Sequence, residues 1–144
     1  MEIQIKFLNL LGKMPKFGSE DAAGVDLYAA TSEDIKIEPH TTVKVGTGIA
    51  VAIPKGYFGG IYARSGLATK KGLRPANGVG VIDADYRGEI IVALHNDTNE
   101  VQTVEAGDRI AQLIIHPYLN ISFSVVEELD ETVRGTGGFG STGV

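Results

Sequence analysis

The sequence contains no cysteine, so neither disulfides nor thiolate metal sites can form. It also lacks an N-terminal apolar segment of the secretory type, and we therefore expect a cytoplasmic protein with no membrane-spanning segment. There is no long basic run, and the net charge of -5 argues against binding to a nucleic-acid backbone. A small anionic ligand would need only a few local cations.

Histidines are few and scattered. His40, His95 and His116 lie far apart in the sequence, and none stands in a short ligand spacing with another. We therefore expect neither a histidine-bound zinc ion nor a catalytic histidine, and we place each histidine at a surface or an interface.

Helical periodicity is also scarce, whereas 19 glycines are spread through the 144 residues. A length of 144 residues is enough for one domain, and an apolar fraction of 43% is enough to form its core. Short apolar runs separated by turns indicate many short strands. The predicted fold class is all-β, a distorted jelly-roll β-sandwich or barrel with one short helix.

Alternating apolar residues predict the individual strands. Ile3, Ile5 and Phe7 share one face of the first strand, and polar side chains occupy the other. A turn at 54–56 ends one apolar run, and Ser65–Lys71 indicates the one helix, with serine as its N-cap. Further strands are expected at 35–37, 43–45, 88–94, 110–115 and 121–125.

The glycine-rich end of the chain, RGTGGFGSTGV from Arg134, cannot pack a core. Its GxGxxG spacing matches a dinucleotide-binding loop, but no helix follows, so that interpretation fails. Consecutive glycines can point several backbone N–H groups at one anion, and Phe139 could stack on a base. Two interpretations stay open, a solvated tail and a lid that orders over a nucleotide.

Two internal segments carry polar groups whose role the residues alone leave open. ARSGLA, from Ala63, places a cation, a hydroxyl and a glycine at the start of the predicted helix, as an anion site or an ordinary helix cap would. NGVGVIDADYRG, from Asn77, predicts a β-hairpin that leads into the core strand at Ile90. Its carboxylates, Asp83 and Asp85, serve either the turn or catalysis.

Two other segments raise a question of charge compensation. Asp26 stands in the small and apolar segment DAAGVDLYAA, where a lone carboxylate costs free energy unless it is paired. We expect a cationic or metal-linked partner for it. In GDRIAQ we expect Asp108 and Arg109 to pair locally where a turn leads into a strand, and Gln112 carries no signal by itself.

Taken together, five segments resemble, in order and spacing, the five motifs of the homotrimeric dUTP diphosphatase (dUTPase) family. They are AGVDLYAA from Ala23, RSGLA from Arg64, GVIDADYRG from Gly80 with Asn77 upstream, GDRIAQ from Gly107 and RGTGGFGSTG from Arg134. The resemblance spans nearly the whole chain, and five ordered motifs are far more specific than any one of them. Ala84, where relatives often carry serine, is the one departure inside the motifs.

The resemblance implies an enzyme that hydrolyses dUTP to dUMP and pyrophosphate, which removes dUTP from the DNA precursor pool and supplies dUMP for thymidylate synthesis. Asp83 is then the general base that activates the water attacking the α-phosphorus. The implied cofactor is Mg2+, whose water shell Asp26 would contact indirectly. The implied assembly is a homotrimer with shared active sites.

The resemblance also implies which residues bind dUTP. Backbone groups of the third motif would read the uracil, Tyr86 and Ile91 would shape the deoxyribose pocket, and the arm would close over the nucleotide. The implied substrate-binding residues are Arg64, Ser65, Gly66, Asn77, Gly80, Val81, Ile82, Asp83, Tyr86, Ile91, Gln112, Arg134, Phe139, Ser141 and Thr142. The expected organisation is a β-barrel catalytic domain at 1–133 and a flexible glycine-rich arm at 134–144.

Two alternatives belong to other classes. One is a dCTP deaminase-like enzyme of the same fold, and the other is a non-catalytic nucleotide-binding β module. The tail and the Asp83 segment match the diphosphatase better than the deaminase, and a scaffold has no use for a catalytic base. Neither nucleic acid nor a membrane is expected as a partner.

Overall fold

The computed structural model describes residues 1–140, and its regular structure lies before residue 118. The one helix of the described chain, α1 (Ser65–Lys71), sits between β7 and β8 in the sequence. The strands are β1 (Gln4–Phe7), β2 (Lys16–Phe17), β3 (Val25–Tyr28), β4 (Ile35–Ile37), β5 (Thr42–Gly46), β6 (Ile49–Ala52), β7 (Tyr57–Tyr62), β8 (Leu73–Pro75), β9 (Gly80–Ile82), β10 (Ile91–Asn96), β11 (Gln102–Val104) and β12 (Arg109–Pro117).

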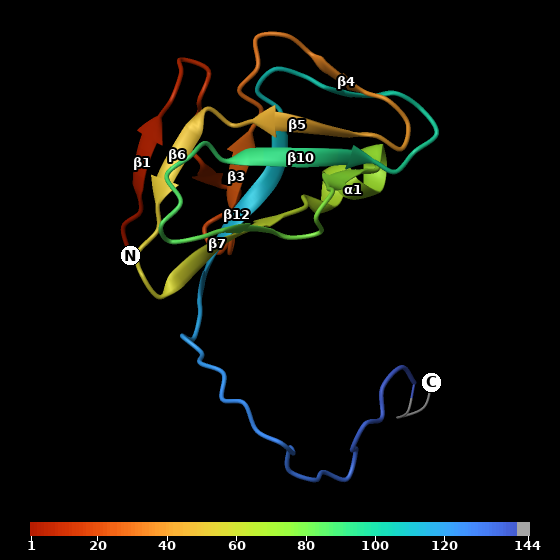
Figure 1. Cartoon of the computed structure of the whole chain (residues 1–144). Coiled ribbons are helices and arrows are strands. Elements are labelled where there is room, and N and C mark those ends of the chain that lie inside the picture. The colour runs from red at the N-terminus through yellow and green to blue at the C-terminus, as the bar shows by residue number, and fades with distance from the viewer. Residues whose placement is uncertain (141–144) are drawn as a thin grey trace.

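The strands form small antiparallel sheets around a shared core (Figure 1). The largest is a five-stranded sheet in the order β2-β3-β12-β7-β9, and a three-stranded sheet has the order β5-β10-β8. Two further pairs, β1-β6 and β11-β4, complete the described body. This arrangement confirms the predicted all-β, jelly-roll-like class with one short helix.

Buried aliphatic side chains from nearly every sheet make up the core. In β10 the alternation is plain, because Val92 and Leu94 are buried whereas Ile91 is exposed. Each fully buried aliphatic side chain contributes roughly 1.5–3 kcal/mol relative to an exposed one. The largest members of the core are Leu27, Ile37, Ile49, Leu73, Ile90, Leu94 and Ile110.

The predicted strand at 121–125 is wrong. No strand lies between Pro117 and residue 140, and Ile121, Phe123 and Val125 are 72%, 90% and 99% exposed. Figure 1 shows this segment running away from the body. An alternating pattern supplies an apolar face, but a strand also needs a neighbour for its backbone N–H and C=O groups, and the described chain offers it none.

The helix is confirmed at Ser65–Lys71, but its predicted serine cap is wrong. Arg64 is the N-cap residue, with an extended backbone, and its side chain makes no capping hydrogen bond. Ser65 is the first helical residue. The helix ends at Gly72, whose φ of 61° is left-handed, as a glycine after a helix commonly is.

The predicted β-hairpin between residues 80–82 and the following core strand is also wrong. β9 pairs with β7, whereas β10 pairs with β5 and β8, so the turn at 83–88 connects two different sheets. The reason lies at Ile90, whose backbone N–H donates to the Ile49 carbonyl at 2.9 Å instead of pairing with β9. This change of sheet places the turn at an edge of the body.

No helix within residues 1–140 combines the length and the apolar character that crossing a bilayer requires.

Asn96 is a polar side chain inside the core, with no exposed surface, and each of its polar atoms has a partner. Its Nδ2 donates to the carbonyls of Ile37 at 2.9 Å and Glu100 at 2.7 Å. Its Oδ1 accepts from the Thr98 N–H at 2.9 Å and the Thr98 hydroxyl at 2.8 Å. This one amide therefore joins the end of β10 to β4 and to the turn that follows.

Replacing Asn96 with alanine leaves these backbone groups without partners in a dry environment. We expect Asn96→Ala to lower the free energy of unfolding by about 3 kcal/mol, measured by urea unfolding at fixed chain concentration. The matched control is Asn99→Ala, because Asn99 is exposed and, within residues 1–140, its side chain hydrogen-bonds only to His40, at 2.8 Å. That change should stay within about 0.5 kcal/mol, and equal losses in both variants would contradict the role assigned to Asn96.

Candidate active site

A small pocket of about 230 Å³ opens beside the turn at 83–88. Its lining consists of residues from β9, the turn and the start of β10. They are Val81, Ile82, Asp83, Tyr86, Glu89 and Ile91. The structure therefore brings together five of the residues that the resemblance assigns to dUTP, four from the third motif and Ile91 after it, and it adds Glu89, which the sequence reasoning missed.

The β9 strand forms one wall of this pocket and is an edge strand of the five-stranded sheet. One side pairs with β7, where Gly80 lies opposite Ile61 and Ile82 opposite Gly59. The other side has no paired strand in the described chain, so its backbone groups face outward, as at any sheet edge. A Cβ on Gly80 would lie 3.4 Å from Asn77 Nδ2, which places the Asn77 amide beside the same strand.

Tyr86 folds back over the turn that carries it. Its backbone N–H donates to the Asp83 carbonyl at 3.1 Å, and its hydroxyl donates to the Glu89 carbonyl at 2.9 Å. A Cβ on Gly88 would collide with the Tyr86 hydroxyl, so glycine is required there for the ring to take this position. Tyr86 as a whole residue is 42% exposed, so it is accessible to a ligand.

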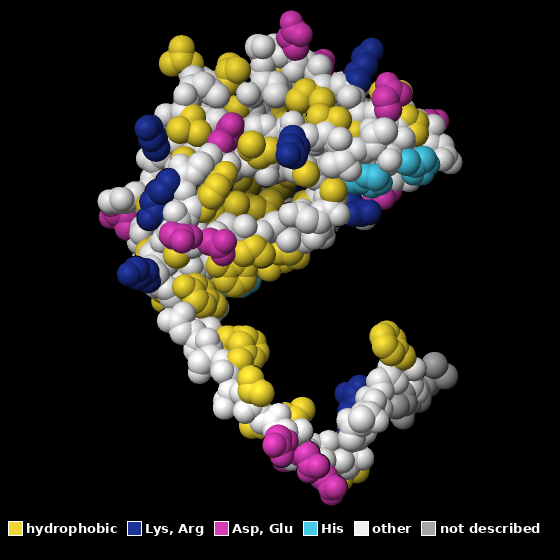
Figure 2. Space-filling model, viewed as in Figure 1, with side chains coloured by type: hydrophobic (Ala, Val, Ile, Leu, Met, Phe, Trp, Pro, Cys, Tyr) yellow, Lys and Arg dark blue, Asp and Glu magenta, His cyan; other side chains and the backbone are white. Residues whose placement is uncertain are grey.

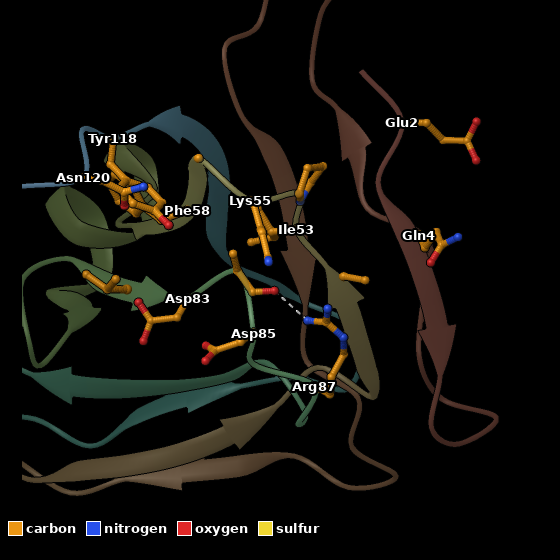
Figure 3. A pocket seen from close by; sticks show the side chains of 15 residues that line it. Glu2, Gln4, Ile53, Lys55, Phe58, Asp83, Asp85, Arg87, Tyr118 and Asn120 are labelled. Atoms are coloured by element: carbon orange, nitrogen blue, oxygen red, sulfur yellow. Dashed lines mark hydrogen bonds between the residues drawn. The ribbon is translucent and has the colours of Figure 1, made fainter.

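Asp83 lies between the small pocket and a wide, open depression of about 1180 Å³ (Figure 3). Figure 3 shows Asp83 and Asp85 leaving the same turn, with Arg87 directed back toward its backbone. Arg87 Nη1 donates to the carbonyls of Ala84 at 2.7 Å and Tyr86 at 2.8 Å. The Asp83 side chain is exposed and forms no ion pair within residues 1–140, whereas Arg87, also missed by the sequence reasoning, braces the turn.

A second group of predicted residues gathers around Asp26 in β3. Asp26 is a buried residue, with 8% of its surface exposed. Its carboxylate has two cationic partners, Arg64 Nε at 2.8 Å and Arg109 Nη1 at 3.2 Å. The expected cationic partner of Asp26 is therefore confirmed. The expected local pair of Asp108 and Arg109 is wrong, because Asp108 Oδ2 instead accepts the Glu105 N–H at 2.9 Å. An unpaired carboxylate costs more free energy when it is buried, as Asp26 is, than at an exposed turn, where Asp108 lies, so Arg109 pairs with Asp26.

Gln112 lies in β12 directly opposite Asp26 of β3 on one side and Tyr62 of β7 on the other. Its Nε2 donates to the Ala63 carbonyl at 2.9 Å, immediately before the start of α1. Space is open at Gly66, where an added Cβ would meet nothing within 4 Å. The predicted phosphate and metal residues Asp26, Arg64, Ser65, Gly66 and Gln112 thus surround one end of the central sheet.

Of the predicted tail residues, the two that the structure describes, Arg134 and Phe139, do not reach either group. Arg134 Nε donates to the Gly137 carbonyl at 2.8 Å within the extended segment, and Phe139 is fully exposed. Ser141 and Thr142 lie outside the described residues. The lining of the small pocket includes neither the group around Asp26 nor any residue of 134–140, so the described chain does not assemble one complete site.

The chain is similar to known proteins in both sequence and structure. The sequence model of the dUTPase family matches residues 11–143. A deoxyuridine 5'-triphosphate nucleotidohydrolase from Desulfitobacterium hafniense is 52% identical over 133 residues, which cover 92% of this chain and 88% of that protein. Solved structures are similar too: a mutant dUTPase of Staphylococcus bacteriophage 80alpha with dUpNHpp has a TM-score of 0.89 at 32% identity and 99% coverage of both chains.

A third similar protein is a mutant dUTPase from phage phi11 of S. aureus, which has a structural Mg(II) ion. Its TM-score is 0.79 at 27% identity, with 89% of this chain and 98% of that chain covered. Fold, pocket and relatives together define an all-β nucleotide hydrolase. More narrowly, the chain belongs to the dUTPase family and is a dUTP diphosphatase, which hydrolyses dUTP to dUMP and pyrophosphate.

The contribution of the two Asp26 ion pairs to the free energy of unfolding can be measured by substitution. Asp26→Asn keeps the shape of the side chain but leaves Arg64 and Arg109 without their counter-charge. Because Arg109 is half exposed, we expect a loss of about 2 kcal/mol in the free energy of unfolding rather than the full cost of a buried pair. Urea unfolding measures it, and Asp108→Asn, whose amide oxygen can still accept the Glu105 N–H, is the control. An unchanged Asp26→Asn would show that the two pairs contribute nothing.

Proposed function

We propose that Asp83 is the general base of dUTP hydrolysis in this enzyme. The observation that carries the proposal is its position at the rim of the small pocket, with an exposed carboxylate on a turn that Arg87 braces. In the reaction a water oxygen bonds to the α-phosphorus while Asp83 takes one of its protons. The bond from the α-phosphorus to the bridging oxygen breaks, and pyrophosphate leaves.

The walls of the same pocket support the assignment of base and sugar recognition. The unpaired backbone edge of β9 and the Asn77 amide offer donors and acceptors to the edge of a uracil ring, much as a neighbouring strand would. Tyr86 would lie against the deoxyribose, with Ile91 on the facing side. A ribose 2′-hydroxyl held against this aromatic wall would be buried without a partner, and UTP is rejected for that reason.

The group around Asp26 is proposed to hold the phosphates. Arg64, Ser65 and the Gly66 backbone would bind the phosphate oxygens, and Gln112 an α-phosphate oxygen or a metal-bound water. The Arg64 guanidinium is oriented by its Nε bond to Asp26, and the Gln112 amide by its bond to the Ala63 carbonyl. The phosphate groups would therefore meet side chains that are already positioned.

Enzymes of this family are generally Mg2+-dependent, and the residues present fit the ion. Residues 1–140 contain no group of three or more histidine, aspartate or glutamate side chains that could hold a metal. Mg2+ needs no such cage, because it keeps several waters and binds phosphate oxygens. Asp26, whose oxygens already accept from two arginines, would contact only its waters. When bound, Mg2+ neutralises charge on the phosphates.

The separation of the three groups supports a homotrimer with shared active sites, in which residues 1–133 form the catalytic body and 134–144 the closing arm. A neighbouring chain would supply the arm, placing Phe139 on the uracil and Arg134, Ser141 and Thr142 on the γ-phosphate. Exposed apolar side chains support the contact between chains; Figure 2 shows them along the extended segment. They include Leu119, Ile121, Phe123, Val125 and Leu129. The nucleotide substrate of the enzyme is intracellular, so we place the enzyme in the cytoplasm.

The base is tested by changing one carboxylate. Asp83→Asn should lower kcat by roughly 10²- to 10⁴-fold in a pyrophosphate-release assay with dUTP, while binding of dUpNHpp is retained. Asp85→Asn, on the same turn, is the control and should keep nearly all activity. If Asp83→Asn retained its rate, or if Asp85→Asn lost as much, Asp83 would not be the base.

The shared site is tested by mixing defective chains. Asp83→Asn trimers and trimers lacking residues 134–144 should each be inactive, for different reasons. After exchange of subunits, some sites combine an intact Asp83 with an intact arm from another chain, and activity should return. Light scattering should give a mass of three times 15.2 kDa. Mixed trimers that stay inactive would show that each chain uses its own arm or none.

A further inference from the structure

Glu89 links the wall of the nucleotide pocket to a neighbouring loop. Its backbone carbonyl accepts the Tyr86 hydroxyl at 2.9 Å, and its side-chain Oε1 accepts the Gly48 N–H at 2.8 Å. One residue therefore contacts the Tyr86 hydroxyl through its main chain and, through its side chain, the loop at 47–48 between β5 and β6. It also lines the small pocket.

The residue after Glu89 is anchored to the same loop. The Ile90 carbonyl accepts from the Thr47 N–H at 3.1 Å and the Thr47 hydroxyl at 2.7 Å, and the Ile90 N–H donates to the Ile49 carbonyl at 2.9 Å. Thr47 and Ile90 are buried. The position of Tyr86 therefore depends on a short, doubly attached stretch rather than on a free loop.

The sequence leaves room for the Glu89 carboxylate. A Cβ on Gly46 would lie 2.5 Å from Glu89 Oε1, and the next two nearest atoms also belong to this carboxylate. Gly46 pairs with Ile91 across β5 and β10, so the space that glycine provides lies on the same face of the sheet as the Ile91 side chain, which lines the pocket. An alanine there would therefore displace the Glu89 carboxylate.

We infer that Glu89 is a positioning residue for substrate selection: it holds Tyr86 where the ring excludes a 2′-hydroxyl, through its bond to the Gly48 N–H. This inference rests on the proposed role of Tyr86 against the deoxyribose. A carboxylate is suited to the task, because hydrogen bonds from a backbone N–H to a charged acceptor are stronger than neutral ones. Without that bond the stretch 86–89 can move away from the loop, and the pocket widens on the side of the sugar.

The test measures kcat and KM for dUTP and for UTP in the full-length enzyme. Glu89→Ala should reduce the ratio of kcat/KM for dUTP to that for UTP by roughly tenfold, chiefly because UTP is accepted better. Glu89→Gln, whose amide oxygen can still accept the Gly48 N–H, should stay within about twofold of the original ratio. A role in stability alone would lower the unfolding midpoint and leave the ratio unchanged, which would overturn the inference.

A second variant reaches the same contact from the other side. Gly46→Ala should displace the Glu89 carboxylate and reduce the ratio as Glu89→Ala does. In the double variant the second change should add almost nothing, because the carboxylate that it would displace is already gone. Fully additive effects would overturn the inference. The exchange rate of the Gly48 amide proton gives an independent readout, and it should rise in Glu89→Ala but not in Glu89→Gln.

Tyr86→Ala separates this inference from the proposed function. If Tyr86→Ala lowers the ratio and Glu89→Ala does not, the role of Tyr86 stands and the positioning role of Glu89 is overturned. If Tyr86→Ala leaves the ratio unchanged, the sugar contact assigned to Tyr86 is wrong and the inference fails with it. A drop in both, with the original ratio kept in Glu89→Gln, supports the two together.

Discussion

The buried carboxylate of Asp26 holds together the part of the molecule where α1 meets the central sheet. It stands on the central sheet between two strands and draws Arg64, from the start of α1, and Arg109, from the start of β12, onto one point. A lone carboxylate in that position would cost free energy, so the two arginines stabilise the packing of the three segments against one another. Arg64 immediately precedes the helix that carries Ser65 and Gly66, so its ion pair with Asp26 also fixes where that helix begins.

At the other end, the pocket exists because the chain changes sheets. β9 finishes as the edge of one sheet and β10 begins inside another, so the turn between them is attached at both ends but covered by neither. Its shape comes from side chains that return to the backbone, Arg87 to Ala84 and Tyr86 to Glu89. A conventional hairpin would have paired β9 with β10 and left β9 without a free backbone edge.

Local patterns predicted the parts of the chain whose structure is decided locally. The alternation that buries Val92 and Leu94 is visible in the sequence, as is the helix at Ser65–Lys71. The pairing of Arg109 with Asp26 was not foreseeable from spacing, because it joins residues far apart in the chain, and Asp108 was the nearer candidate. The strand expected at 121–125 failed for a related reason, since the sequence pattern of a strand does not say where its partner is. Glu89 escaped notice because its partner, Gly48, is a backbone group with no signature.

The extended segment after Pro117 also bears on how new chains behave before they assemble. Ile121, Phe123 and Val125 form an exposed alternating apolar segment with no strand beside it. Segments of this kind tend to form non-native β-pairs with other unfolded or partly folded chains. The residues that follow are EELDE, at 127–131, and Figure 2 shows acidic side chains at the bend of this segment. Acidic flanks of this type act as gatekeepers, because stacked copies would bring like charges together. The acidic residues at 127–131 thus lie directly beside the exposed apolar segment 121–125, where their charge opposes aggregation.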